Sequence, residues 1–167
     1  MKNFISELKD IKINNLLTNG SVILGLDIGD KTVGVSVSDR RLQIATGVTT
    51  IQRINTKRDF VQLKESVNRY KIGCIIFGWP VQMNGQPGPQ CEKTLEFVEE
   101  LKEYFENTSF SYWDERFSTS AVTNILITAD LSRKKRKKVI DKNAAVYILQ
   151  GALDFLNRTQ KNSCPNF

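Results

Sequence analysis

The chain has 167 residues, of which 40% are hydrophobic and 25% are charged. This length suits one domain, and the composition excludes a globally disordered chain. The net charge is +6, and the six residues from Arg133 to Lys138 are all Lys or Arg, so the rest of the chain is electrically balanced. A single basic block on a neutral body predicts one contact surface for a polyanion.

The chain contains no histidine, which excludes Ser-His-Asp and Cys-His catalysis and histidine-ligated zinc. Any acid-base or metal chemistry must therefore use carboxylates. The cysteines Cys74, Cys91 and Cys164 form no CxxC pair, so we expect neither a zinc knuckle nor a disulfide framework, and we expect a reducing, cytoplasmic location. No apolar stretch is long enough for a signal sequence or a membrane span, so we expect no membrane association.

The first third of the chain predicts an extension followed by three strands. Residues 1–20 carry apolar side chains at helical spacing and end in a turn signal, which indicates an amphipathic N-terminal extension outside the core. From residue 21 to residue 51, an apolar run, an alternating valine segment and a third apolar segment follow one another between tight turns. This pattern predicts an antiparallel meander of three strands.

The rest of the chain predicts helices that alternate with strands, because the spacing of apolar residues switches between the helical period of about 3.6 residues and continuous apolar runs typical of buried strands. The predicted elements are a helix over 56–70, a buried strand over 72–79, a Gly/Pro loop over 81–90, a helix over 91–105, a strand over 109–113, a helix from Ser118 or Thr119 to about 129, and a last helix that Asp141 opens and that ends near 157. A polar tail follows over 158–167. We therefore expect one α/β domain over 21–157, with a mixed sheet of five strands and helices on its faces.

Three acidic positions stand where a strand or helix end meets a turn. Asp27 interrupts an apolar first strand, where a carboxylate is costly unless it is paired or binds a metal; the alternative is an edge-strand residue that faces water. Asp114 and Glu115 follow a strand at its carboxyl end, and the register decides which of the two points inward. Asp141 begins the last predicted helix, so an ordinary N-cap is the alternative to a site residue.

Three converging carboxylates would form a site of hard oxygen donors, because no histidine or thiolate accompanies them. Such a donor set selects Mg²⁺ or Mn²⁺. A site of this kind activates water and stabilises the leaving oxygen in phosphodiester cleavage.

Four sequence motifs stand out in chain order over about 21–157. They are Leu26-Asp27-Ile28-Gly29-Asp30-Lys31-Thr32-Val33-Gly34-Val35-Ser36-Val37-Ser38-Asp39, Gly78-Trp79-Pro80 with Asn84-Gly85, Asp114-Glu115-Arg116-Phe117-Ser118-Thr119, and Asp141 with Ala144-Ala145-Ile148-Leu149-Gln150. These motifs resemble, in the same order, those of the YqgF (RuvX) family of ribonuclease H-like proteins.

The resemblance implies a ribonuclease H-like fold and a cytoplasmic nuclease that processes the 5′ end of precursor 16S rRNA during ribosome biogenesis, with Holliday-junction resolution as the alternative. Carried over by position, the catalytic, metal-binding acids are Asp27, Glu115 and Asp141. Only this analogy chooses Glu115 over Asp114.

Basic residues near these acids are candidates for contact with substrate. Lys31 and Arg116 hold a scissile phosphate or form an ion pair with an acid. The basic block consists of Arg133, Lys134, Lys135, Arg136, Lys137 and Lys138. It grips a phosphate backbone or forms a solvated face. Trp79 and Tyr112 are candidate stacking partners for bases, and core packing is the alternative.

The first hypothesis is therefore a Mg²⁺-dependent nuclease acting on structured RNA or branched DNA, as a monomer or a homodimer. A non-catalytic nucleic-acid-binding module of the same fold would keep the basic block and ignore metal. An ATPase related to actin and sugar kinases would use the residues after Asp27 as a phosphate loop, but the chain lacks room for a second lobe.

Overall fold

The computed structural model describes residues 5–82, 86–114 and 133–163, with the side chains of 133–142 and 161–163 excepted. One six-stranded sheet with the strand order β1-β6-β5-β2-β3-β4 forms its centre. The strands are β1 (Ile5–Ser6), β2 (Val22–Ile28), β3 (Thr32–Ser38), β4 (Ala45–Gln52), β5 (Ile72–Trp79) and β6 (Ser109–Asp114). The helices are α1 (Ile13–Thr18), α2 (Thr56–Ser66), α3 (Pro89–Leu101) and α5 (Arg133–Ser163), with 3₁₀ turns η1 (Leu8–Asp10) and η2 (Lys102–Tyr104).

The predicted meander is confirmed. Strand β2 pairs antiparallel with β3, and β3 pairs antiparallel with β4. Strands β5 and β6 then add in parallel on the other side of β2. The parallel strands need crossover connections, and α2 and α3 supply the helices that the alternation of periods predicted.

The predicted count of five strands was wrong by one. Ile5 and Ser6 form β1, which pairs in parallel with Phe110 and Ser111 of β6. The N-terminal segment also packs on the sheet, since Ile13 of α1 is only 3% exposed. A two-residue strand that pairs with a segment about a hundred residues away leaves no local periodicity in the sequence.

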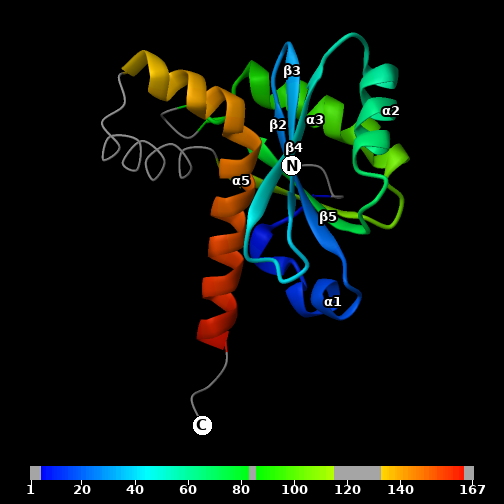
Figure 1. Ribbon diagram of the computed structural model, residues 1–167, viewed down its shortest axis with the longest axis vertical. Coiled ribbons are helices and arrows are strands. Elements are labelled where there is room, and N and C mark those ends of the chain that lie inside the picture. Colours follow the sequence, from blue (N-terminus) through cyan, green and yellow to red (C-terminus); the bar gives the residue numbers. More distant parts are fainter. Residues whose placement is uncertain (1–4, 83–85, 115–132, 164–167) are drawn as a thin grey trace.

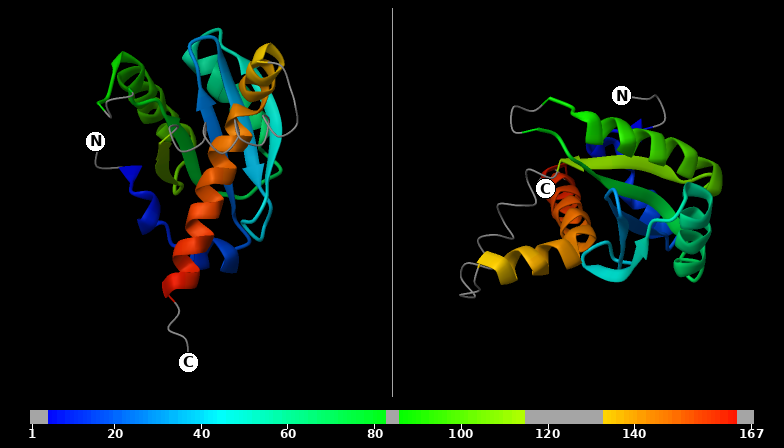
Figure 2. Two further views of the ribbon diagram at one scale, coloured as in Figure 1. Left: turned by 90° about the vertical axis from the view of Figure 1, so that its left-hand side faces the viewer. Right: turned by 90° about the horizontal axis from the view of Figure 1, so that it is seen from above.

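Helices cover the two faces of the sheet unequally. Figure 1 shows α5 on one side of the strands and α2 and α3 on the other, and the view from above in Figure 2 separates these three layers. One apolar cluster joins α2 and α3 to side chains such as Leu24 and Phe77. A second cluster joins α5 to Ile23 and Ile76. Because side chains alternate along a strand, odd-numbered positions of β2 face α5 and even-numbered positions face α2 and α3.

The long helix α5 begins at Arg133, well before the predicted start at Asp141. Its buried stripe runs from Ala145 to Leu156 and contacts β2, β3, β4 and β5. In Figure 1 the first turns of α5, drawn in yellow, run at an angle away from the sheet. The basic block therefore lies on a helical segment that projects from the body. The helix predicted over Ser118 or Thr119 to about 129 lies outside the described residues.

Candidate functional site

Asp27 lies on the central strand β2, in the face that α5 covers. Strand β2 is hydrogen-bonded to β3 on one side and β5 on the other, so the hypothesis that Asp27 belongs to an edge strand was wrong. The residue is half-buried and it has an interaction partner, as a carboxylate in a covered sheet face requires. Asp27 thus stands in an interior position that packing alone does not favour.

A glycine opposite Asp27 makes room for the helix. Gly34 of β3 is the register partner of Asp27. A Cβ atom at position 34 would lie 3.2 Å from the Cβ of Ala145 and 3.4 Å from the Cβ of Asp27. A larger side chain at Gly34 would therefore occupy the space between the carboxylate-bearing strand and α5.

A buried hydroxyl fixes α5 to the same part of the sheet. Ser36 of β3 is fully buried, and its Oγ donates a hydrogen bond of 2.7 Å to the carbonyl oxygen of Ala145. Gly25 lies beneath this contact, since a Cβ there would lie 2.7 Å from the Cβ of Leu149. The helix runs antiparallel to β2, because Leu149 lies over Gly25 and Ala145 lies over the later position Gly34, the partner of Asp27.

Asp141 stands one helical turn before Ala145. Four residues separate the two positions, so both belong to one stripe of α5. Since α5 begins at Arg133, Asp141 lies inside the helix, and the interpretation of Asp141 as an N-cap was wrong. The antiparallel course of α5 carries position 141 toward the carboxyl end of β2, where Asp27 lies. The Asp141 side chain lies outside the described residues.

The acidic pair at the end of β6 is described only in part. Asp114 ends β6, pairs in register with Trp79 of β5, and is half-buried with an interaction partner. Trp113 packs in the cluster under α5, whereas Tyr112 packs in the opposite cluster. The two-residue period assigns Asp114 to the Tyr112 side of the sheet. Glu115 lies outside the described residues, as does Arg116.

Lys31, a candidate phosphate-binding residue, lies at the same end of the sheet as Asp27. Lys31 is exposed in the turn between β2 and β3, and its carbonyl oxygen accepts a 2.9 Å hydrogen bond from the Arg53 amide. The basic block 133–138 forms the start of α5, and the first turn of this helix contains no acidic residue. Positive side chains at a helix N-terminus are unfavourable for the macrodipole, so the block is a poor helix start. Its side chains lie outside the described residues.

The predicted ligand set for a metal remains a prediction. Within 5–82, 86–114 and the described part of α5, no three Asp, Glu, Cys or His side chains are grouped so as to hold a metal ion. Of the predicted ligands, Asp27 alone has a described side chain. The donor set fits a hard divalent cation because it consists of carboxylates only.

Trp79 packs in the core and is not an accessible stacking surface. It is 8% exposed, and its ring centroid lies 6.4 Å from that of Phe77 and 5.9 Å from that of Tyr112. Core packing, the alternative for Trp79, is therefore confirmed.

The described part of the chain contains no helix long and apolar enough to span a bilayer.

Sequence reasoning missed the small residues that seat α5, namely Gly25, Gly34 and Ser36, and it also missed Trp113. The signal for the first three was available, because small residues at alternating positions of two neighbouring strands indicate a close approach on one face. Trp113 directly precedes Asp114 in β6, so its nearness to the candidate acids could be read from the sequence.

The comparisons with known proteins agree on the family. The chain matches the family described as "RuvX: Holliday junction resolvase" over residues 21–155. It is 52% identical over 141 residues to a protein of Thermoanaerobacter pseudethanolicus named "Putative pre-16S rRNA nuclease", a match that covers 84% of this chain and 98% of that protein. A Clostridium botulinum protein with the same name is 48% identical over 136 residues, which cover 81% of this chain and 98% of the relative.

A solved structure shows the same fold at low sequence identity. It is T. thermophilus RuvC in complex with a Holliday junction substrate, which matches with a TM-score of 0.52 and 13% identity, over 83% of this chain and 96% of that chain. The fold class predicted from the sequence, a ribonuclease H-like mixed sheet with helices on both faces, is thereby confirmed. With the family match over 21–155 and relatives near half identity, the chain belongs to the RuvX (YqgF) family.

Proposed function

We propose that this protein is a metal-dependent nuclease that hydrolyses phosphodiester bonds in the 5′-end processing of precursor 16S rRNA, in the cytoplasm. The observation that carries the proposal is the position of Asp27, a half-buried carboxylate on a central strand beneath a helix seated by Gly34 and Ser36. The names of the relatives at 52% and 48% identity give the substrate.

The residues that would hold a divalent cation are Asp27, Glu115 and Asp141. Strand β2 carries the first, the alternation of β6 predicts that the second follows Trp113 on the same face, and the stripe of α5 that contains Ala145 predicts the third. A bound Mg²⁺ or Mn²⁺ supplies an activated water and stabilises the leaving oxygen. Asp27 holds its position because β2 is a central strand, and α5, which carries position 141, is fixed to β3 through Ser36.

Basic residues bind the substrate backbone. Lys31 is exposed beside the carboxyl end of β2, and the basic block leads along α5 toward Asp141. Arg116 follows Glu115 directly and holds a phosphate in bidentate fashion. Contact of all six block residues with phosphate would give a log–log salt slope of about −5 on a duplex and about −4 on a single strand.

The second candidate function is cleavage of branched DNA, which the family's description as a Holliday junction resolvase favours. The two candidates differ in substrate while sharing the same carboxylates. A resolvase makes two symmetric cuts and would act as a homodimer, whereas trimming of an RNA end needs one site and a monomer suffices.

The experiment offers the protein a labelled precursor 16S 5′-leader RNA and a labelled four-way DNA junction in parallel, each with Mg²⁺ and with EDTA. We expect RNA cleavage that requires Mg²⁺, at a rate well above that on the junction. Preferential cleavage of the junction would identify branched DNA, instead of RNA, as the substrate. Salt-sensitive binding of both substrates without cleavage of either would contradict the nuclease and favour the binding module.

A further inference from the structure

A cavity with aromatic walls lies at the edge of the sheet, between the end of β6 and the middle of α5. Its volume is about 640 Å³, which lies in the range of sites for small organic ligands. The aromatic residues among its lining are Tyr112, Trp113 and Phe155. Charged residues surround them, namely Glu7, Lys9, Asp114, Asp154 and Arg158.

The Trp113 indole packs directly against a glycine of α5. A Cβ at Gly151 would come within 2.9 Å of Cζ2 and 3.1 Å of Nε1 of this indole. Phe155, one turn further along α5, meets the indole edge-on at a centroid distance of 6.2 Å. Phe155 is 39% exposed, so an aromatic surface remains open to solvent at this wall.

The sheet register places one wall residue of the cavity, Trp113, in the same row as Asp27. Trp113 pairs with Gly78, and Leu26 pairs with Phe77, so Trp113, Gly78 and Asp27 occupy one row across β6, β5 and β2. Trp113 and Asp27 both face α5. Two strand spacings separate their Cα atoms by about 10 Å. This distance equals about three base rises of a nucleic acid strand.

One wall of the cavity comes from residues outside the family match. Glu7, Leu8 and Lys9 follow β1, which pairs with β6, and they precede the matched range that begins at residue 21. Arg158 follows the end of that range at residue 155. The cavity in this form is therefore a property of this chain's own terminal segments together with the shared core.

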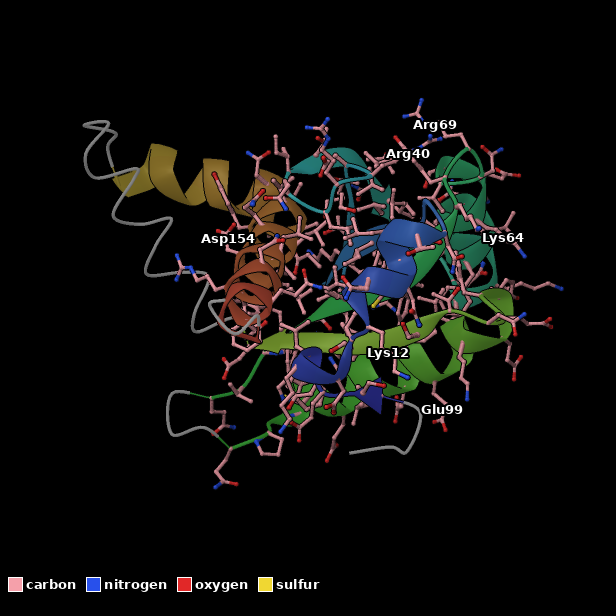
Figure 3. The ribbon with its side chains drawn as sticks, turned by 90° about the horizontal axis from the view of Figure 1, so that it is seen from below. Lys12, Arg40, Lys64, Arg69, Glu99 and Asp154 are labelled. Carbon is pink, nitrogen blue, oxygen red and sulfur yellow. The ribbon has the colours of Figure 1, made fainter. Side chains whose placement is uncertain are left out.

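We infer that this cavity binds one unpaired nucleobase of the substrate strand, within about three nucleotides of the cleaved bond. Every base has a π-face that stacks on an aromatic side chain, and Trp113 and Phe155 provide the surface. Asp154, on α5 beside Phe155, accepts hydrogen bonds from amino groups on a base edge, and Arg158 and Lys9 bind the adjoining phosphates. Figure 3 shows Asp154 on α5, at the opposite side of the molecule from Lys64 on α2. The inference rests on the proposed function for the identity of the strand.

The test is an abasic scan in which single-stranded leader RNA loses one base at a time. Binding is measured in EDTA, so the result does not depend on cleavage. With the wild-type protein, removal of one particular base weakens binding about tenfold, as expected for one stacked base. With Phe155→Ala, the same abasic RNA binds no more weakly than the intact RNA.

Two further variants keep the test decisive. Val61→Ala is the matched control, because Val61 is 44% exposed and lies on α2, on the other face of the sheet; it should keep the wild-type abasic profile. The added Cβ of Gly151→Ala displaces the Trp113 indole from its place against α5, so this variant should remove the same single-position effect as Phe155→Ala. Thermal melting verifies that each variant is folded.

If Phe155→Ala and Gly151→Ala leave the abasic profile unchanged, the inference that the cavity binds a base is overturned, even if the protein cleaves RNA. The same holds if Phe155→Ala changes self-association in sedimentation and leaves RNA binding unchanged, because a second copy of the chain would then occupy the surface. A retained single-position effect in a protein that cleaves nothing would instead refute the nuclease and leave the cavity standing.

Discussion

Ser36 donates a buried hydrogen bond of 2.7 Å to the main-chain carbonyl of Ala145, and this bond joins the middle of the sheet to the helix that covers Asp27. The two residues are 109 positions apart in the chain. The hydroxyl also lies 3.3 Å from the carbonyl oxygen of Gly25, so three elements meet at one oxygen atom. The placement of α5 over the candidate site therefore depends on small side chains in β2 and β3.

Substitution of Gly25 by Ala should be strongly destabilising. The added Cβ would overlap the Ser36 hydroxyl and would lie 2.7 Å from the Cβ of Leu149. We expect the free energy of unfolding to fall by about 3 kcal/mol, at the upper end of the cost of overpacking. Urea titration measures this. Gly47→Ala is the control, because its Cβ would make an ordinary 3.5 Å contact with Val146; an equal loss in both variants would contradict the explanation.

Asp59 and Arg53 form a second link between layers, on the face opposite α5. Asp59 is 2% exposed; its Oδ1 accepts a 3.0 Å hydrogen bond from the Ile54 amide, and its Oδ2 lies 3.6 Å from Nε of Arg53. Arg53 in turn donates to the carbonyl oxygen of Gly29, two residues after Asp27. The buried carboxylate thereby orients the side chain that holds the turn between β2 and β3.

Asp59→Ala should therefore lower the free energy of unfolding by about 2 kcal/mol, since it leaves the Ile54 amide without its acceptor and Arg53 without its neighbouring carboxylate. The matched control is Asp30→Ala, which removes an ion pair of 3.0 Å with Lys93 whose two side chains are 64% and 60% exposed. An exposed pair contributes about 1 kcal/mol at most. Chemical denaturation measures the free energy of unfolding of both variants. Equal decreases would show that burial of the carboxylate does not determine how much stability is lost.

Asp39 should make stability depend on acid pH. Partial burial alone raises the pKa of Asp39, but hydrogen bonds from the backbone amides of Ile44, Gln43 and Arg41 outweigh it and hold the pKa below its ordinary value. A lowered folded-state pKa gives stability that is present above the unfolded pKa near 4 and is lost as the pH falls through the folded value.

The measurement compares the wild type with Asp39→Asn in urea titrations from pH 6 to pH 2.5. The stability advantage of the wild type should be constant above about pH 5 and should shrink below pH 4. An advantage that does not change with pH would mean that the hydrogen bonds do not discriminate between the charged and neutral carboxyl group.

Cys74 should be inert in the folded protein. Complete burial raises the pKa of its thiol to about 12 from 9.0, and a hydrogen bond with Ser109 offsets only part of this. The thiolate is the reactive form, so iodoacetamide at pH 8.5 should leave Cys74 unmodified in native protein and alkylate it in denaturant. Peptide mass spectrometry reads the result. Rapid native alkylation of Cys74 would contradict its burial in the core between β2, β5 and α5.

The sequence predicted the strands well because their apolar patterns are local. The predicted strand over 72–79 coincides with β5, and the predicted helix beginning at Thr56 coincides with the start of α2. The end of α2 was placed four residues too late, since the helix ends at Ser66 although Val67, which extends the apolar pattern, is 2% exposed. A buried residue after a helix continues the spacing without continuing the helix.

The start of α5 could not be predicted from capping rules. Those rules place a helix start at an acidic or hydroxyl residue, and Asp141 satisfies them, whereas the helix begins eight residues earlier in a run of positive charge. Asp27 could be predicted as an interior strand position from its apolar neighbours. The close approach of Ala145 to Gly34, the register partner of Asp27, could not, because it depends on how closely α5 approaches the sheet.

The most direct measurement is single-turnover cleavage of the leader RNA by wild type and by Asp27→Asn, with binding of the same RNA measured in parallel. Asparagine keeps the size of the side chain and removes its charge, so the variant should fold and bind RNA with near wild-type affinity. We expect cleavage in Mg²⁺ to fall by at least about a hundredfold, as for removal of a group that acts on the transition state. Undiminished cleavage by a folded Asp27→Asn would contradict the assignment of Asp27 to the catalytic site.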